Sequence, residues 1–568
     1  MGVNQKHEGL RLKHEGLRRL GVQLRLPEVS PSVLILAVSL LWLVLFNLPV
    51  LRQSLDAGGA SGWAQDVGLV LALGLLVVVT HVLLLALLGL SVLLRPLLGL
   101  MTLAAAAATH FSASYGVVLD PGMMRNVLAT HPAEARELVT LSLASDLTLK
   151  GMVPALLVLY WPLRSQGWRR GLTQRLVLIA GALLTGLLVL WLAYQPLASL
   201  VRNHRDLRYL ITPANLLWSG SLAVRRDVHR ASTPREPIGL DANPGDSWAT
   251  RKRPLVVVLV VGETARAANW GLNAGARDTT PQLRQRSVIN FSRVTSCGTN
   301  TEVSLPCMFA PIGRRDYDES RIRGQESLLH VLSRAGVQVH WLDNQSGCKG
   351  VCDGLPFDQP RTLKTTGCAD SDCLDDALLH GLPDVLKHAQ GTHLRVLHMI
   401  GNHGPAYYRR YPQAFEHFSP ACTDDNLHKC STEAVVNAYD NALRFTDHVL
   451  ARAIDLLQAA SDRVDTALIY VSDHGESLGE KGLFLHGMPY RIAPEEQTRV
   501  PMVWWLGPGL DAAIGLPEGC ADGTLLRAAQ DLVAHDHLFH SLLGLFDVRT
   551  ALHEPRLDLL AHCRWPAR

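Results

Sequence analysis

The chain has 568 residues, of which 48% are hydrophobic, and its formal net charge is +3 at pH 7. This length is sufficient for several domains, and a charge so near balance indicates no particular partner. Because no basic patch is interleaved with aromatic residues, we expect no nucleic-acid partner. The hydrophobic fraction is high for a water-soluble protein, and the apolar residues are unevenly distributed.

Five apolar runs lie within the first 200 residues. A helix needs about 20 apolar residues to span a bilayer. Four runs approach or exceed this length without Asp, Glu, Lys or Arg: Val33–Leu51, Gly68–Leu94, Pro96–Leu119 and Leu176–Leu200. The fifth run, Leu147–Leu163, contains Lys150 near its start. We expect residues 1–200 to form a five-helix membrane domain, and the alternative for each run is a buried core helix.

The charged residues between these runs predict the orientation of the chain, because loops rich in Lys and Arg stay in the cytoplasm. Residues 1–32 carry Lys6, Arg11, Lys13, Arg18, Arg19 and Arg25, and the loop 164–175 carries four arginines and no acid. The alternate loops, 52–67 and 120–146, are neutral to acidic. We therefore expect a cytoplasmic N-terminus, a connecting segment at residues 201–253, and a domain outside the cytoplasm at residues 254–568.

All ten cysteines lie at or after Cys297. An even number confined to one region indicates disulfides in an oxidising compartment, which agrees with this orientation. Short spacings favour four pairs and leave the last two cysteines for a fifth, although sequence does not determine connectivity: Cys297–Cys307, Cys348–Cys352, Cys368–Cys373, Cys422–Cys430 and Cys520–Cys563. The alternative, a cysteine-ligated zinc site, lacks two close pairs with zinc-finger spacing.

Strand patterns alternate with helical patterns from Leu255 onward. The predicted strands are Leu255–Val261, Val337–Leu342, Leu394–Ile400, Ala467–Ser472 and Val500–Leu506. The predicted helices are Gln325–Arg334, Glu433–Ala460 and Leu525–Leu545. Such alternation is typical of a mostly parallel sheet with helices on both faces, so we expect an α/β domain.

Polar residues of metal-ligand type follow three of these strands. Glu263 follows the first strand, His403 the third, and Asp473 with His474 the fourth. In open α/β sheets, sites form at the carboxyl ends of the strands. Zinc takes nitrogen and carboxylate-oxygen ligands. The pattern therefore predicts a metalloenzyme, and the alternatives are a solvated turn at Asp473-His474 and a surface histidine at His403.

The stretch Cys297–Cys307 is the best candidate for a nucleophile. If the two cysteines close a tight loop, Thr301 lies where the loop becomes a helix. A helix N-terminus carries partial positive charge and free backbone N–H groups, which stabilise an alkoxide and an incoming phosphate. Coordination of the hydroxyl to zinc lowers its pKa further. The alternative is that Thr301 is only the N-cap of that helix.

Five motifs occur in one order along the chain: Gly262-Glu263-Thr264-Ala265-Arg266, Cys297-Gly298-Thr299-Asn300-Thr301, Asn402-His403-Gly404-Pro405, Ser472-Asp473-His474-Gly475-Glu476-Ser477 and Leu485-His486-Gly487. With the apolar runs and the cysteine-rich region, they resemble the phosphoethanolamine transferases of Gram-negative inner membranes, which include lipid A-modifying and mobile colistin-resistance enzymes. The resemblance covers nearly the whole chain. It implies a five-span membrane domain followed by an alkaline-phosphatase/sulfatase-like catalytic domain in the periplasm.

The resemblance also implies a role for each residue of the motifs. One catalytic zinc ion is bound by Glu263, Thr301, Asp473 and His474, and Thr301 is also the nucleophile. Two histidines, His403 and His486, line the site and either hold a second zinc ion or protonate the leaving group.

Further residues match family positions that bind the substrate. Lys349 contacts the donor phosphate, and Glu476 lies near the ethanolamine amine. Asn126, Thr130 and Glu134 bind the donor lipid; their spacing places them on one helical face, so the alternative is a merely polar helix face. The chain departs from the family at Gln345, where relatives often carry Asp or Asn, and the longer side chain bears on substrate specificity.

The reaction implied is transfer of phosphoethanolamine from phosphatidylethanolamine to a phosphate of lipid A, through a covalent threonine intermediate. The modified lipid A carries less negative charge, which weakens the binding of polymyxin and other cationic peptides. We expect a monomer in the inner membrane.

Three alternatives remain at this point. In the first alternative, the acceptor is a Kdo or heptose of the lipopolysaccharide core or another periplasmic glycan. In the second alternative, the enzyme is a phosphoglycerol transferase or a sulfatase-like hydrolase. In the third alternative, the chain is a catalytically dead membrane sensor; the presence of all four candidate zinc ligands argues against it.

Overall fold

The computed structural model describes residues 27–58, 63–88, 93–130, 132–203, 205–231, 234–363, 368–369 and 372–564. They divide into two compact units. The first unit holds the described residues up to Ala107, together with Asp146–Leu207 and Ile211–Ala214. The second holds Ala108–Ser145, Arg208–Leu210 and the described residues from Asn215 onward. The expected domain bounds of 1–200, 201–253 and 254–568 stay a prediction.

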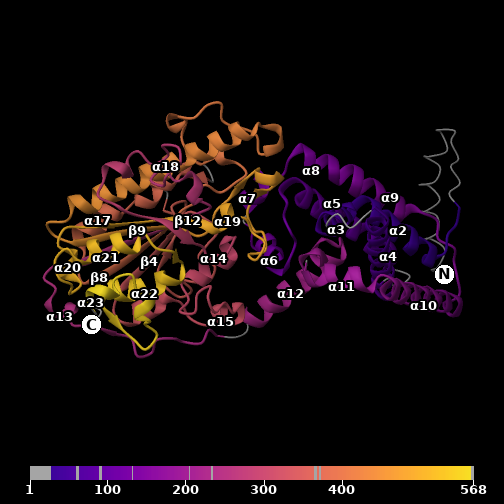
Figure 1. The fold of residues 1–568 in the computed structure, drawn as a ribbon, viewed down its shortest axis with the longest axis horizontal. Coiled ribbons are helices and arrows are strands. Elements are labelled where there is room, and N and C mark those ends of the chain that lie inside the picture. Colours follow the sequence, from indigo (N-terminus) through magenta and orange to yellow (C-terminus); the bar gives the residue numbers. More distant parts are fainter. Residues whose placement is uncertain are drawn as a thin grey trace, which may run out of the picture. The chain divides into compact units, whose positions relative to one another are not determined.

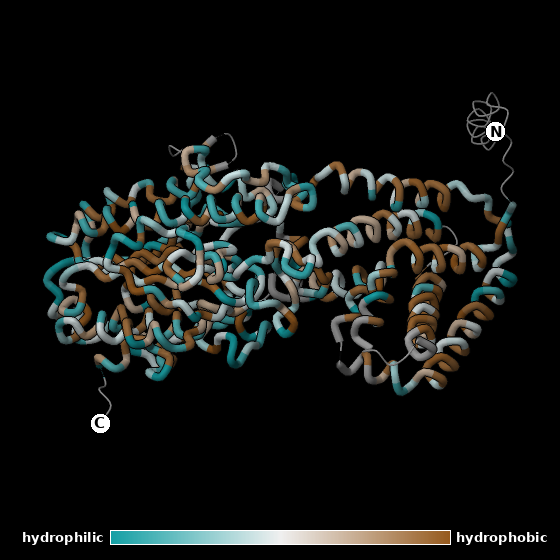
Figure 2. Tube along the Cα trace, turned by 45° about the horizontal axis from the view of Figure 1, so that its top comes forward, coloured by the Kyte–Doolittle hydropathy of each residue, from teal (hydrophilic) through white to brown (hydrophobic). Residues whose placement is uncertain are grey.

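The first unit is built from apolar helices, which appear in brown in Figure 2. They are α2 (Pro31–Phe46), α3 (Leu48–Gly58), α4 (Trp63–Leu88), α5 (Leu94–Tyr115, whose last turns belong to the second unit), η2 (Leu147–Met152), α9 (Val153–Tyr160), α10 (Trp168–Leu192) and α11 (Tyr194–Asn203). Among the described residues, four helical segments are long and apolar enough to span a membrane: Val67–Leu88, Leu94–Tyr115, Leu141–Tyr160 and Trp168–Leu192. These segments confirm a multi-span membrane domain.

The first expected span, Val33–Leu51, is interrupted at Asn47. Helix α2 has 16 residues, which at 1.5 Å per residue extend about 24 Å, less than the hydrocarbon thickness of about 30 Å. The Asn47 amide donates to the carbonyl oxygens of Trp42 and Thr212 at 2.9 and 2.7 Å, and Pro49 has no N–H for a helical hydrogen bond. The span at Val33–Leu51, and with it the total of five spans, therefore stays a prediction.

The second unit is organised around a sheet of order β13-β3-β12-β9-β2-β8-β4-β5. Its strands are β2 (Leu255–Gly262), β3 (Ile289–Thr295), β4 (Gln338–Asp343), β5 (Phe357–Asp358), β8 (Thr392–His398), β9 (Asp465–Ser472), β12 (Arg499–Leu506) and β13 (Val533–Ala534). The central strands β9, β2, β8 and β4 are parallel. Strand β12 runs antiparallel to both neighbours, so the prediction of a mostly parallel sheet is confirmed.

Both faces of the sheet are covered, which explains why β2 is a continuous apolar run. Alternate residues of β2 belong to two different hydrophobic clusters. Val257 and Leu259 pack in the cluster that contains α16 (Leu328–Arg334), α21 (Cys520–Ala528) and α22 (Asp536–Leu545). Val256 and Val258 pack in the cluster that contains α17 (Leu382–His388) and α18 (Thr432–Ala459). Figure 1 shows α18 and α22 on opposite sides of the strands.

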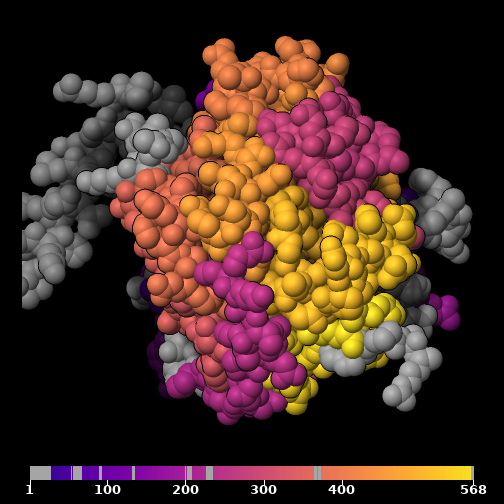
Figure 3. Space-filling view, turned by 90° about the vertical axis from the view of Figure 1, so that its left-hand side faces the viewer, coloured from indigo at the N-terminus to yellow at the C-terminus, as the bar shows by residue number. Residues whose placement is uncertain are grey.

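Shorter helices and strands complete the second unit. They are α6 (Pro121–Ala129), α7 (Pro132–Glu137), α8 (Leu141–Asp146), α12 (Ala214–Ala231), α13 (Ser247–Thr250), α14 (Thr301–Met308), α15 (Glu319–Gly324), α19 (Glu495–Thr498), α20 (Leu510–Ala513), α23 (Ala561–Arg564), β1 (Asn243–Pro244), β6 (Cys368–Ala369), β7 (Asp372–Cys373), β10 (Ser477–Leu478), β11 (Phe484–Leu485) and β14 (Val548–Arg549). Strands β1 and β14 pair across some 300 residues of sequence. In Figure 3, the magenta segment near residue 240 accordingly lies against the yellow C-terminal part.

One predicted helix is wrong. The pattern over Leu525–Leu545 is divided into α21 and α22, with strand β13 between them. Strand β13 pairs in parallel with β3 at the edge of the sheet. The helix therefore gives way to a strand pairing that the local apolar periodicity does not encode.

All five predicted disulfides are confirmed: Cys297–Cys307, Cys348–Cys352, Cys368–Cys373, Cys422–Cys430 and Cys520–Cys563. The cysteine-ligated zinc site is therefore wrong, because every cysteine has a sulfur partner. The last disulfide joins α21 to α23 across 43 residues, and it fastens the C-terminal segment to the sheet.

We expect the Cys520→Ser/Cys563→Ser double variant to lower the free energy of unfolding of the second unit by about 4 kcal/mol, because a loop of this length loses its closure constraint in the unfolded chain. Denaturant unfolding followed by tryptophan fluorescence measures the change. A midpoint equal to that of the unmodified protein contradicts the prediction. The disulfide Cys348–Cys352 closes a much shorter loop, with a separation of 4 residues. The Cys348→Ser/Cys352→Ser variant is therefore the control, and its free energy of unfolding should fall by less.

Candidate active site

The carboxyl ends of β2 and β9 place three of the predicted residues side by side. The two strands are parallel, and Gly262 is paired with Ser472. The next residues along the two strands, Glu263 and Asp473, therefore leave the sheet together, and His474 follows Asp473. Side-chain atoms of Glu263, Asp473 and His474 lie within 4.8 Å of one another, and all three side chains are fully buried.

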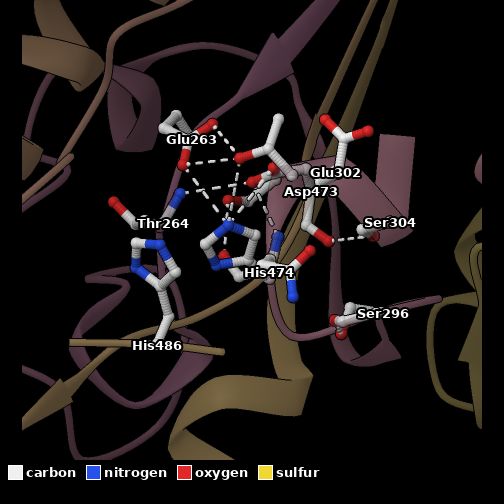
Figure 4. Close-up of polar contacts among 12 residues, drawn as sticks. Glu263, Thr264, Ser296, Glu302, Ser304, Asp473, His474 and His486 are labelled. Carbon is white, nitrogen blue, oxygen red and sulfur yellow. Dashed lines mark hydrogen bonds and ion pairs between the residues drawn. The ribbon is translucent and has the colours of Figure 1, made fainter. Parts of the chain in front are cut away.

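Thr301 reaches this cluster from the first turn of α14. Its Oγ1 lies 3.1 and 3.0 Å from the two carboxylate oxygens of Glu263 and 3.3 Å from Nε2 of His474. Figure 4 shows Glu263, Asp473 and His474 converging on one point, with His486 beside His474. The four predicted metal ligands are thus within reach of a single ion.

The local sequence explains why Thr301 faces the cluster. Asn300 is the N-cap of α14, and its side chain accepts a hydrogen bond from the N–H of Val303 at 2.9 Å. The interpretation of Thr301 as the N-cap is therefore wrong, and its hydroxyl is left to face Glu263. The disulfide Cys297–Cys307 holds the preceding loop against the helix, and Ser304 donates to the carbonyl oxygen of Asp473.

The two buried carboxylates of the cluster, Glu263 and Asp473, favour the binding of a cation. Burial and the neighbouring Glu263 carboxylate raise the pKa of Asp473 to about 7. Within the described part of the chain, Asp473 Oδ2 accepts no hydrogen bond although it is buried. An uncompensated buried carboxylate is costly, and a positive ion between Glu263 and Asp473 removes that cost. The donor set of two carboxylates, an imidazole and a hydroxyl fits zinc.

Other residues of the site escaped the sequence analysis. His398 Nδ1 lies 2.7 Å from Asp343 Oδ1 in a fully buried pair, and His398 interacts electrostatically with Glu263 and Asp473. Tyr407 donates its hydroxyl to Glu476 at 2.7 Å. Asp343 directly follows one predicted strand and His398 lies within another, and these positions were the one signal in the sequence that could have indicated the pair. Gln345, the noted departure, donates through Nε2 to Glu263 Oε2 at 3.3 Å, so it contacts a predicted metal ligand directly.

Known proteins are similar to this chain over most of its length. Residues 77–228 match the family model described as phosphoethanolamine transferase EptA/EptB, and residues 256–548 match the sulfatase model. The phosphoethanolamine transferase EptA of Salmonella typhimurium is 39% identical over 469 residues, which cover 81% of this chain and 84% of that protein. The phosphatidylethanolamine transferase Mcr-1 of Escherichia coli is 37% identical over 92% of this chain and 96% of its own. The chain belongs to the phosphoethanolamine transferase family.

A solved structure agrees over nearly the full length. The integral membrane lipooligosaccharide phosphoethanolamine transferase A of Neisseria meningitidis superposes with a TM-score of 0.88 at 34% identity, covering 95% of this chain and 100% of that one. The present chain is therefore an inner-membrane phosphoethanolamine transferase, and its sulfatase-like catalytic domain lies in the periplasm. The alternative of a dead sensor is overturned by this family membership.

Two predicted histidines of the transferase lie beside the cluster. The ring of His486 is 4.4 Å from that of His474 and 5.6 Å from that of His403, measured between centroids. Burial alone would lower the pKa of His486, but the ion pair with Glu476 raises it to about 9. Burial and the neighbouring His486 hold the pKa of His403 well below its usual value. The site therefore places a protonated imidazole next to a neutral one.

Glu476 is held by both of its oxygens. One accepts from Tyr407, and the other lies 2.8 Å from Nδ1 of His486.

We expect Tyr407→Phe to lower the rate of phosphoethanolamine transfer about tenfold, the effect of about 1.4 kcal/mol for a lost hydrogen bond to a charged group. Steady-state transfer assays measure it. Tyr408→Phe is the matched control, because that hydroxyl contacts Asp425 instead; an equal loss in both variants contradicts the role of Tyr407.

Lys349 lies close to α14. Its Nζ donates to Oγ of Ser346 at 2.6 Å and lies 3.9 Å from Glu302 Oε2, and the side chain is 8% exposed. Lys349 is therefore not a solvated loop residue. Its charge is instead available to a phosphate that reaches Thr301.

The predicted donor-lipid residues do not share one helical face. Asn126 lies in α6, but Thr130 is already its C-cap in an extended conformation, and α7 begins at Pro132. Proline has no N–H for the helical ladder and its ring clashes with the preceding turn, so the helix breaks there. Glu134 belongs to α7, and its side chain lies outside the described residues. The assignment of these residues to the donor lipid stays a prediction.

Proposed function

We propose that this enzyme transfers phosphoethanolamine from phosphatidylethanolamine to a phosphate of lipid A through a covalent intermediate on Thr301. The supporting observation is the hydroxyl of Thr301 at 3.0–3.3 Å from Glu263 and His474, at the N-terminus of a helix in a buried site. Its relatives are named phosphoethanolamine transferases, which supports the transferred group, and one more distant relative is named a Kdo(2)-lipid A phosphoethanolamine 7''-transferase.

In the first half-reaction, the hydroxyl proton of Thr301 passes to the Glu263 carboxylate oxygen 3.0 Å away. Oγ1 of Thr301 forms a bond to the donor phosphorus, and the bond from phosphorus to the diacylglycerol oxygen breaks. The helix N-terminus stabilises the negative charge on the phosphoryl group, and Lys349 adds a second positive charge. His486, the protonated imidazole of the two, gives a proton to the departing diacylglycerol oxygen. In the second half-reaction, an acceptor phosphate oxygen bonds to the phosphorus, the bond from phosphorus to Oγ1 breaks, and Thr301 takes its proton back from Glu263. The hydroxyl proton of the acceptor phosphate passes to His486 and restores its charge.

Glu263, Thr301, Asp473 and His474 would hold one zinc ion, with His403 and His486 available to a second. Bound zinc supplies positive charge that lowers the pKa of the threonine hydroxyl and stabilises the phosphoryl oxygens. Glu476 balances the charge of His486 and offers a carboxylate to the ethanolamine amine. Dividing the transfer into two displacements replaces one difficult step by two easier ones.

Intact-protein mass spectrometry tests the intermediate. Purified enzyme is incubated with phosphatidylethanolamine and no acceptor, and the proposal predicts a mass increase of one phosphoethanolamine group located on Thr301 by peptide mapping. Adding lipid A should then discharge the label. A label on another residue contradicts the assignment of the nucleophile, and a label that only core oligosaccharide discharges contradicts lipid A phosphate as the acceptor.

A further inference from the structure

A segment between two membrane helices packs against the active site. We call residues 114–142, which contain α6 and α7, the strap; they belong to the same unit as the catalytic sheet. A Cβ placed on Gly487 would lie 2.0 Å from the Cε of Met123, and one on Gly122 would lie 4.0 Å from Val303. The strap therefore touches both the Leu485-His486-Gly487 motif and the helix of Thr301.

The first half of the strap is tied to α14 through a chain of buried and half-buried charges. Arg125, whose side chain is 3% exposed, forms an ion pair with Glu319 on α15. Glu319 also lies 3.7 Å from Arg323 Nε on the same helix. Arg323 pairs with the Glu302 carboxylate at 2.8 Å and donates to the carbonyl oxygen of the same residue. Glu302 directly follows Thr301, so the chain of charges ends at the first turn of the nucleophile's helix.

The second half of the strap is tied to the predicted proton-transfer histidine. Glu137, the last residue of α7, pairs with Arg410 Nη2 at 2.5 Å, and both side chains are 8% exposed. The same guanidinium donates through Nε to the carbonyl oxygen of His403 at 2.8 Å. One arginine thus connects α7 to the backbone of a site residue.

The two ties lie on either side of the residues assigned to the donor lipid. Arg125 precedes Asn126, and Glu137 follows Glu134, so the donor stretch is held at both ends. We propose that Arg125 and Glu137 are positioning residues that fix the strap over the site, so that the donor lipid's phosphorus is presented to Thr301; this inference rests on the proposed function. Neither side chain touches the reacting atoms.

The buried ion pairs suit this role because of what their loss leaves behind. Removing one partner of a buried pair exposes an uncompensated charge to a low-dielectric surrounding, and the structure relaxes to solvate it. Release of either end would let the strap shift away from α14 or from His403. A misplacement of about 1 Å lowers the rate of an oriented reaction by up to about 100-fold, whereas the reactivity of Thr301 itself would be retained.

The test compares two donors with the full-length enzyme in detergent micelles. One is phosphatidylethanolamine, and the other is p-nitrophenyl phosphoethanolamine, a soluble ester that has no acyl chains and does not need the strap. The variants are Arg125→Met and Glu137→Gln, with Arg125→Lys as the conservative variant. The matched control is Arg286→Met, which removes a two-contact ion pair with Asp455 on the surface of the same unit.

We expect Arg125→Met and Glu137→Gln to lower turnover of phosphatidylethanolamine at limiting donor by about tenfold or more, with a raised half-saturating concentration. Release of p-nitrophenolate should match that of the unmodified enzyme, which also shows that the variants fold. Arg125→Lys should recover part of the lipid turnover, and Arg286→Met should change neither rate.

Two results overturn the inference: an equal loss with both donors, or lipid turnover in both variants equal to that of Arg286→Met. The unmodified enzyme reports on the proposed function in the same assay. If the unmodified enzyme uses neither donor, the proposed function fails. If it uses both donors and the variants turn over both at the same rates as the unmodified enzyme, only the strap inference fails.

Discussion

Thr301→Ala should lower the rate of phosphoethanolamine transfer by more than about 10⁴-fold, the scale on which loss of a covalent nucleophile lowers kcat. The reason is geometric, because the hydroxyl of Thr301 faces Glu263 and His474 from the N-terminus of α14. Within the described residues the Thr301 side chain is buried, and alanine fills nearly the same space, so folding should be preserved. Transfer from fluorescent phosphatidylethanolamine to lipid A, followed by chromatography, measures the loss.

Thr301→Ser and Thr299→Ala are the controls for this variant. Serine keeps the hydroxyl and should retain transfer, although with a less restricted rotamer. Thr299 is buried on the same loop, but its hydroxyl donates to the carbonyl oxygen of Met488, so its loss should affect stability more than the chemical step. Equal activity of Thr301→Ala and the unmodified enzyme would remove the covalent step from the account.

Asp473→Asn should abolish zinc binding and transfer while it stabilises the metal-free protein. In the metal-free site, Glu263 and Asp473 place two carboxylates in one buried cluster, and like charges that close repel each other. An amide oxygen still accepts from the N–H of His474, which the Asp473 carboxylate accepts at 2.7 Å. The variant therefore loses the repulsion and keeps the backbone contact.

Thermal unfolding with and without a chelator, together with zinc analysis, measures this effect. A ligand at 100 times its Kd stabilises the folded state by about 2.7 kcal/mol, so chelation should destabilise the unmodified enzyme and leave Asp473→Asn unchanged. Asp447→Asn is the matched control: this buried carboxylate accepts from the N–H groups of Gln282 and Leu283, and none of these residues belongs to the cluster. A chelator effect in Asp473→Asn equal to that in Asp447→Asn would contradict a metal held by Asp473.

The residues at strand ends were predictable because sheet geometry brings them together. Glu263 and Asp473 are separated by 210 residues in sequence, but each follows a wholly buried parallel strand. Two apolar runs of that kind pair in register, so their next residues meet at one edge. The same kind of apolar run predicted β4, β8 and β12, although β12 is antiparallel to its neighbours.

Other features depend on pairings that a single sequence does not encode. Strand β3 was missed because only part of it is buried and its apolar residues do not alternate strictly. The tie between Arg125 and Glu319 joins residues 194 apart, and neither residue type specifies its partner. The break between α6 and α7 was foreseeable from Pro132, but the spacing of Asn126, Thr130 and Glu134 favoured one continuous helix.

The most direct test of the account is mass spectrometry of lipid A from cells that express the unmodified chain or its Thr301→Ala variant at equal levels. The account predicts one added phosphoethanolamine group on lipid A with the unmodified chain, and none with the variant. The same modification in both strains would contradict Thr301 as the nucleophile, and unmodified lipid A in both would contradict lipid A as the acceptor.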